Sequence, residues 1–214
     1  MTELVVNEIF HSIQGESTHT GRPCVFVRLT YCNLRCTWCD TPYAFEAGSR
    51  MSVEAIVSAV ESFRCGLVEV TGGEPLMQEG VHDLFRSLCD RGYEVLVETS
   101  GSLDVGGVDR RVRRIVDFKC PGSGMEKKNL WSNVRFLTPQ DEVKFVILDR
   151  GDFDWAVAKI NEYRLDTRCT ILMSVVFGEL EPVHLARWML DERINARLQL
   201  QVHKFIWEPS ARGV

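Results

Sequence analysis

The chain of 214 residues is 45% hydrophobic and 26% charged and contains 16 glycines and 7 prolines, a composition that excludes fibrous, disordered and low-complexity proteins. Its net charge of −5 and its scattered basic residues argue against nucleic-acid binding; one basic run, at residues 110–114, is typical of the exposed surface of a helix. The first residues lack a signal-peptide pattern, and no apolar run approaches the ~18 residues of a membrane helix. We therefore expect a single domain over residues 1–214, located in the cytoplasm without a membrane or nucleic-acid partner.

Short apolar runs alternate with helical patterns along the chain. The runs are typical of strands covered on both faces, and they lie at residues 23–30, 67–71, 93–98, 114–118, 142–147, 170–175 and 198–202. We expect helices that begin after Ser52, run from Val81 towards Gly92, run from Asp152 through Ile160, and begin at Pro182. Strands that alternate with helices form parallel sheets, so the pattern predicts an α/β fold, either an incomplete (β/α) barrel of about six parallel strands or an open sheet.

Eight cysteines are many for a protein of this size. Five of them stand alone, without a second cysteine at a metal-ligand spacing. In a reducing compartment we expect these five to be small buried hydrophobic residues rather than disulfides: Cys24, Cys65, Cys89, Cys120 and Cys169.

The other three cysteines are Cys32, Cys36 and Cys39, within eight residues directly after the 23–30 run. Parallel α/β folds place their chemistry in loops at the carboxyl ends of strands, so this loop is a candidate site. Four interpretations compete: buried thiols, a zinc site completed by His11 or His203, a redox pair formed by the last two cysteines, and an iron–sulfur cluster. Three thiolates on a four-iron cluster would leave one iron free to bind a small chelating molecule.

The Cys-x3-Cys-x2-Cys spacing, with Trp38 just before the last cysteine, resembles the signature of the radical S-adenosylmethionine (SAM) enzymes. The resemblance implies that the three cysteines hold a 4Fe-4S cluster and that SAM binds the open iron and is cleaved reductively to a 5′-deoxyadenosyl radical. The family's Gly-Gly-Glu-Pro element, which receives the methionyl amino group of SAM, is matched by residues 72–75 after the second strand. The resemblance implies cofactor contacts from Trp38, Cys39, Asp40, Gly73, Ser100, Lys119 and Ser174. Bonds from Asp40 to nearby backbone amides and a simple turn at Ser100 remain alternatives.

A narrower resemblance lies in residues 7–17 (Asn-Glu-Ile-Phe-His-Ser-Ile-Gln-Gly-Glu-Ser), 20–29, 39–41 and 203–209, which are similar to the 7-carboxy-7-deazaguanine synthases. It implies radical ring contraction of 6-carboxy-5,6,7,8-tetrahydropterin to 7-carboxy-7-deazaguanine with loss of ammonia, a carbon–nitrogen lyase reaction that feeds queuosine and other deazapurines. The implied substrate contacts are Ile13, Gln14, Gly15, Arg28, Thr71, His203 and Pro209. The same analogy suggests a homodimer and a reducing electron donor such as flavodoxin.

The chemistry of two of these side chains suits a pterin, because Gln14 can read its flat donor and acceptor edge and Arg28 can bind its carboxylate with two parallel hydrogen bonds. Thr41 matches the family's Mg²⁺ ligand, and a single hydroxyl is compatible with the way magnesium retains water. Without the family, Thr41 is equally a turn or cap residue, and His203 an ordinary structural histidine.

Two other functions stay open. A radical activase, which makes a glycyl radical on a partner protein, also combines such a cysteine loop with a short chain, but it offers no match to residues 14–16. A zinc-stabilised binding module is the alternative without catalysis. Cys120 is a further discriminating residue, because a fourth thiolate would close the cluster to SAM.

Overall fold

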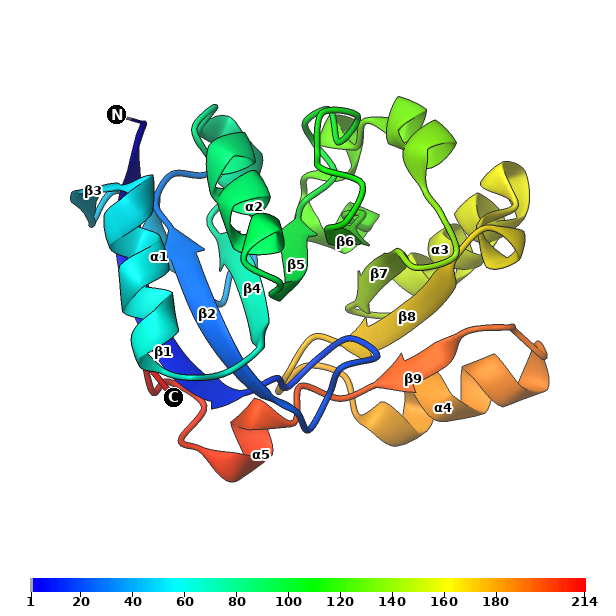
Figure 1. Cartoon of the computed structure of the whole chain (residues 1–214). Helices are drawn as coiled ribbons and strands as arrows, with labels where there is room; N and C mark the ends of the chain where they lie inside the picture. The colour runs from blue at the N-terminus through cyan, green and yellow to red at the C-terminus, as the bar shows by residue number, and fades with distance from the viewer. Residues whose placement is uncertain (1) are drawn as a thin grey trace.

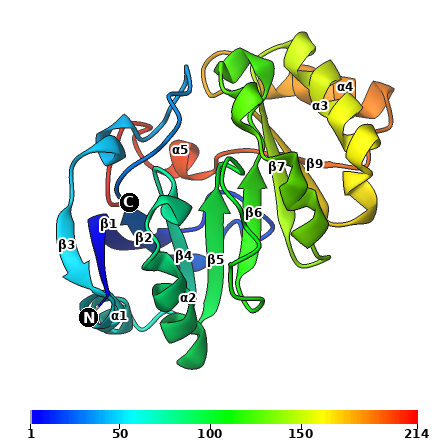
Figure 2. The same ribbon diagram turned by 90° about the horizontal axis from the view of Figure 1, so that it is seen from above.

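A single nine-stranded sheet runs through residues 2–214, which are the residues that the computed structural model describes (Figures 1 and 2). Its order is β3-β1-β2-β4-β5-β6-β7-β8-β9. The strands are β1 (Glu3–Ile13), β2 (Pro23–Leu29), β3 (Ser49–Ser52), β4 (Leu67–Gly72), β5 (Glu94–Thr99), β6 (Arg113–Asp117), β7 (Glu142–Ile147), β8 (Thr170–Val175) and β9 (Arg197–Gln199). All neighbours from β2 to β9 pair in parallel, whereas β1 is antiparallel to β2 and β3. The sheet is not closed, which confirms the predicted incomplete barrel.

The sheet is covered by four longer helices: α1 (Val53–Ser62), α2 (Val81–Asp90), α3 (Arg150–Tyr163) and α4 (Pro182–Asp191). The Ser52 hydroxyl accepts a hydrogen bond from the N–H of Ala55, so Ser52 caps α1 as predicted. The expected start of α3 is wrong, because Asp149 is its cap and accepts from the N–H of Asp152. Asp152 instead lies in the first turn of α3, where its buried carboxylate accepts from the N–H groups of Gly122 and Leu148.

Four further local expectations need correction. Strands β1 and β3 were not predicted, and they add an antiparallel edge to the parallel strands. The expected strand at residues 198–202 is shortened to β9, and α3 extends beyond Ile160. The basic run at residues 110–114 is a turn that leads into β6 rather than a helix, and Arg114 is buried there beside Asp141.

Alternation along the strands separates an apolar outside from a polar inside. On β4, Val68 and Val70 pack against the helices, while Glu69 and Thr71 point to the opposite face of the sheet and line a cavity. One apolar cluster joins α1 and α2 to the first half of the sheet, and a second joins α3 and α4 to the other half. A smaller cluster, which includes Cys24 and Leu67, lies at the amino ends of the parallel strands. The carboxyl ends are therefore the side on which polar chemistry can be built.

After β9 the chain crosses to the side of β1 and β2 through the short helix α5 (His203–Ile206), as Figure 2 shows. The N–H of Val202 donates to the carbonyl of Gly15 at 2.9 Å, and the Gln201 amide donates to Glu16 at 2.8 Å. These bonds tie residues 201–214, here called the C-terminal segment, to the connection between β1 and β2. None of the helices within residues 2–214 combines the length and the apolar character needed to cross a membrane.

Candidate active site

A cavity of about 240 Å³ opens at the carboxyl ends of β2, β4, β5, β6 and β7. It is bordered by the cysteine loop on one side and by the C-terminal segment on another. Most of the residues predicted for the site line this one cavity: Ile13, Gln14, Gly15, Arg28, Cys32, Cys36, Trp38, Cys39, Asp40, Thr41, Thr71, Gly73, Ser100, Lys119 and His203. The fold thus brings together segments that are separated by almost 200 residues of sequence.

The cysteine loop is fixed from its outer side. Thr37 donates to the carbonyls of Ser123 (backbone N–H, 3.2 Å) and Gly122 (hydroxyl, 3.0 Å), and Asn33 donates to the Ser102 hydroxyl at 3.0 Å. The loops after β5 and β6 therefore hold the backbone, while the three thiols line the cavity. A side chain at Gly73 would collide with the Cβ of Cys32 and the carbonyl of Tyr31. Only glycine therefore allows the carboxyl end of β4 to approach the cysteine loop this closely.

The donor set of this loop fits an iron–sulfur cluster with one open position. Burial raises the pKa of the Cys32 and Cys36 thiols, as expected for sulfurs placed away from solvent without a bound cation. Within the described residues, no three Cys, His, Asp or Glu side chains are gathered around one point as ligands of a single metal ion, whereas the thiolates of a four-iron cluster bind separate irons. Cys120 is buried outside the cavity, and His11 lies on the outer side against Phe63, so neither is placed as a fourth ligand.

Glu74 of the Gly-Gly-Glu-Pro element fixes the neighbouring strand end. It is fully buried, and its carboxylate accepts from the Thr99 hydroxyl and from the backbone N–H and hydroxyl of Ser100 at 2.6–2.9 Å. It also accepts from the N–H of Leu76 at 3.0 Å. The glutamate thereby joins the ends of β4 and β5 and orients Ser100 at the cavity wall.

Arg28 is oriented by a neighbour that the sequence did not single out. Its Nε donates to Glu8 at 2.7 Å, and the same carboxylate oxygen accepts from the Tyr43 hydroxyl at 3.0 Å. The guanidinium also lies 5.8 Å from the centre of the Phe10 ring. Because Nε is occupied, the two terminal nitrogens of Arg28 remain for an anion in the cavity.

Gln14 also lines the cavity, but both ends of its side chain contact the protein. Its amide nitrogen donates to the buried carboxyl of Glu69, and its oxygen accepts from the N–H of Glu16 at 2.9 Å. Burial, together with the nearby Glu98 and Glu16 charges, raises the pKa of Glu69 well above its usual range. Glu69 thus fixes the orientation of Gln14 by accepting the hydrogen bond from its amide nitrogen.

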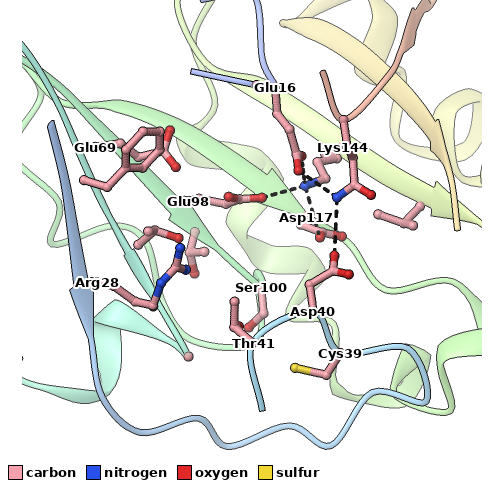
Figure 3. A pocket seen from close by; sticks show the side chains of 18 of the residues that line it. Glu16, Arg28, Cys39, Asp40, Thr41, Glu69, Glu98, Ser100, Asp117 and Lys144 are labelled. Atoms are coloured by element: carbon pink, nitrogen blue, oxygen red, sulfur yellow. Dashed lines mark hydrogen bonds and ion pairs between the residues drawn. The ribbon is translucent and has the colours of Figure 1, made fainter. Parts of the chain in front are cut away.

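A charged wall forms the inner side of the cavity (Figure 3). Lys144 on β7 forms ion pairs with Glu16 and with Glu98, the latter at 2.6 Å, and lies 3.9 Å from Asp117. Lys119 pairs with Asp117 at 2.8 Å. Glu16, Glu98, Asp117 and Lys144 were not predicted as site residues, although a charge within an apolar strand is a usable signal.

Asp40 and Thr41 follow the last cysteine at the mouth of the cavity (Figure 3). Asp40 accepts from the Lys204 ammonium at 2.7 Å and from the Gln201 amide at 3.3 Å, so it pairs with the C-terminal segment. The Thr41 side chain makes no capping hydrogen bond to the short helix that follows it.

Two predicted residues lie outside the cavity. Ser174 is buried on β8 beside Gln199 of β9, and Pro209 is exposed on the C-terminal segment. Val214, which the sequence did not suggest, lines the cavity instead. Only the path of the chain after β9 determines which of its residues reaches the site.

Comparison with known proteins gives two concordant findings. The model of the radical SAM superfamily matches residues 27–182. Proteins named 7-carboxy-7-deazaguanine synthase match nearly the whole chain: that of Chlorobaculum tepidum is 46% identical over 214 residues (99% of this chain, 97% of its own), and that of Koribacter versatilis is 43% identical over 224 residues (98% and 99%). This chain belongs to the 7-carboxy-7-deazaguanine synthase family of the radical SAM superfamily.

A solved structure agrees with this 7-carboxy-7-deazaguanine synthase fold. The crystal structure of QueE from Escherichia coli matches with a TM-score of 0.77 over 94% of this chain and 95% of that chain; at 23% identity it shows the shared fold. Family membership implies a 4Fe-4S cluster and SAM as cofactors, and Cys32, Cys36 and Cys39 are the residues of this chain that would hold the cluster. When bound, these two groups would supply a carbon-centred radical able to abstract hydrogen.

Proposed function

We propose that this protein converts 6-carboxy-5,6,7,8-tetrahydropterin to 7-carboxy-7-deazaguanine with release of ammonia, as a carbon–nitrogen lyase, and that residues 1–214 form one catalytic domain. The observation that carries the proposal is the shared cavity, in which the three-cysteine loop faces Arg28 and the segment Ile13 to Glu16. The names of the relatives support the same reaction.

The chain's own residues would bind and orient the substrate. Arg28, held by Glu8, would bind the substrate carboxylate through its two terminal nitrogens. The stacked rings of Phe10 and Phe26, with centres 5.0 Å apart, give the cavity an apolar wall against which a flat ring can lie. The C-terminal segment would limit the access of water, which matters because a radical must be protected from side reactions.

We also propose Mg²⁺ at Thr41. The Thr41 hydroxyl lines the cavity without a capping role, and Asp40 adds a carboxylate nearby. Magnesium binds few protein oxygens and completes its shell with water or substrate, so the substrate carboxylate would be a suitable further ligand. Omission of Mg²⁺ is expected to raise the KM for the substrate while leaving the iron content unchanged.

Three further assignments do not come from this structure: a homodimeric assembly and a reducing electron donor such as flavodoxin, which come from the family, and a cytoplasmic location, which comes from the sequence. Eight free cysteines suit a reducing compartment, which supports the last of these. Size-exclusion chromatography with light scattering would test the dimer directly.

The reaction is tested by anaerobic reconstitution with iron and sulfide, followed by incubation with SAM, a reductant and 6-carboxy-5,6,7,8-tetrahydropterin. We expect the product and ammonia in equal amounts, and no product from a Cys36→Ala variant treated identically. Cleavage of SAM without conversion of the pterin would contradict the proposal and favour a radical activase. About one zinc per chain and no iron after anaerobic purification would favour the zinc-stabilised module.

A further inference from the structure

Lys144 is a buried cation surrounded by carboxylates. It lies on β7 with 5% of its surface exposed, and its ammonium faces carboxylates from three other segments (Figure 3). Glu98 comes from β5 at 2.6 Å, Asp117 from β6 at 3.9 Å, and Glu16 from the connection between β1 and β2. All four side chains line the cavity, and the cysteine loop contributes none of them.

Without Lys144, Glu16 and Glu98 would be buried carboxylates with no cation paired to them, whereas Asp117 would keep Lys119, so burial and mutual repulsion would favour the neutral forms of the two glutamates. Burial by itself raises the pKa of Glu16, but the Lys144 charge and hydrogen bonds from Lys144 and Gln201 outweigh it and hold the pKa at about 2. Burial, together with the Glu16 and Asp117 charges, raises the pKa of Glu98 above its usual value, and the Lys144 charge limits that rise. The carboxylates in turn outweigh the effect of burial on Lys144 and raise its pKa, so the ammonium stays charged.

The wall around Lys144 leaves some of its hydrogen-bond acceptors without a donor. In the described part of the chain, Asp117 Oδ1 and Gln199 Oε1 are buried without a hydrogen-bond partner. Asp117 Oδ1 stays unpaired although Lys119 also donates to Asp117, and although Gln199 and Gln201 share the Glu16 carboxylate with Lys144. A ligand that donates hydrogen bonds is therefore favoured here, whereas Arg28 offers only donors at another part of the cavity.

We propose that Lys144 is a positioning residue, which holds Glu16 and Glu98 ionised and directed into the cavity so that they accept hydrogen bonds from the amino and ring N–H groups of an aminopyrimidine-type substrate. The proposal rests on the proposed function for the identity of that substrate. It also fixes the substrate's direction, with its donor edge at Lys144 and its carboxylate at Arg28.

A structural role alone makes a different prediction. Replacing a buried ion network by apolar groups often leaves stability unchanged or improves it, so unfolding experiments do not separate the two roles. The pH dependence of substrate binding does, because only the positioning role depends on the ionisation of Glu16 and Glu98. The charged or titratable groups near this network are Glu16, Glu69, Glu98, Asp117, Lys119, Arg28 and His203.

The direction of the pH effect follows from the loss of the cation. In Lys144→Met, the pKa values of Glu16 and Glu98 rise, so protons bind as the pH falls and the acids present an O–H to the substrate's N–H groups. We expect the affinity of the variant relative to the unsubstituted protein to fall by up to about tenfold per pH unit between about pH 8.5 and about pH 6. Titration of the substrate itself cancels in that ratio.

Calorimetric titration of the reconstituted protein with 6-carboxy-5,6,7,8-tetrahydropterin, under anaerobic conditions with SAM present, measures the ratio. Lys144→Arg, which keeps the charge, should restore a ratio that is independent of pH. Lys159→Met on α3, which removes a lysine paired with Glu162 outside the cavity, is the matched control and should bind normally at every pH. A pH-independent ratio for Lys144→Met, or the same pH dependence in Lys144→Arg, would overturn the proposal.

A second measurement needs no substrate. It uses Lys144→Gln, so it is still possible if the Lys144→Met protein does not fold. In ¹³C-carboxyl NMR, with Glu16→Gln used for assignment, Glu16 should remain ionised down to about pH 4 in the unsubstituted protein and titrate near neutrality in Lys144→Gln. Unchanged titration in Lys144→Gln would refute the role of Lys144. Absence of pterin binding by the unsubstituted protein, with the expected NMR result, would instead refute the proposed function.

Discussion

Replacement of Glu74 by glutamine tests the hydrogen bonds that join the carboxyl ends of β4 and β5. Both carboxylate oxygens accept from a backbone N–H that cannot rotate away: Oε1 from Leu76 at 3.0 Å and Oε2 from Ser100 at 2.8 Å. An amide supplies only one acceptor oxygen, so in either orientation of the glutamine side chain its NH₂ group faces an N–H donor. The substitution keeps the volume of the side chain and removes one of its two acceptor oxygens.

The size of the effect follows from the burial of this site. One buried backbone N–H left without an acceptor costs ~1–3 kcal/mol, and the other bonds to Glu74 lose their charge assistance. Relief of the burial of a charge offsets part of this, so we expect a net loss of about 2–3 kcal/mol in the free energy of unfolding. For a chain of this length the corresponding fall in Tm is about 4–12 °C.

Thermal unfolding followed by circular dichroism, on protein without cluster or SAM and under reducing conditions, gives the Tm without the stabilisation that ligands add. Glu79→Gln is the matched control, because Glu79 is exposed five residues away, and its Tm should not change. A Tm for Glu74→Gln within about 1 °C of the unsubstituted protein would refute the geometry described for this strand end. A fall of equal size in both variants would point to a loss of net charge instead.

Three other substitutions test separate contacts. Arg28→Lys should raise the KM for the carboxylated pterin by about tenfold or more, because one of two charge-assisted hydrogen bonds is lost, while a pterin without the carboxylate should bind equally to both proteins. Cys120→Ala should retain its iron after reconstitution and Cys36→Ala should lose it, as measured by iron and sulfide analysis; loss in both would make Cys120 a ligand. Gly15→Ala places a Cβ against the His203 ring, so we expect the C-terminal segment to be cleaved faster in limited proteolysis, and unchanged cleavage would argue against its close packing.

The sequence was sufficient where structure is encoded locally. Most of the parallel strands are continuous apolar runs, and the cysteine loop is defined by residue type and spacing, so both were predicted without knowledge of the fold. Ser52 and Pro182 were recognised as helix starts for the same reason, since a cap acts on its own first turn.

The missing strands lack such a local signal. Strand β3 has the sequence Ser-Arg-Met-Ser, which is mostly polar, and it exists because β1 offers it an edge. In β1 most residues are partly buried, without a clean alternation, because this strand lies between two antiparallel neighbours near the edge of the sheet. The contact of Val214 with the cavity depends on the path of the whole C-terminal segment. No single residue of that segment predicts this path.

The charged wall of the cavity could be predicted in part from the sequence. Burying a charge without a partner is costly, so Glu69, Glu98 and Lys144, each directly after a valine in its strand, indicate that one face of these strands lines a polar interior. Which charges meet there depends on register: Asp117 is the direct neighbour of Lys144 across β6 and β7, whereas Glu98 belongs to the next strand beyond β6 and reaches the same ammonium only because the sheet curves around the cavity. A charge within a buried strand therefore predicts a polar site from sequence alone, but the pairing that gives Lys144 its proposed role requires the fold.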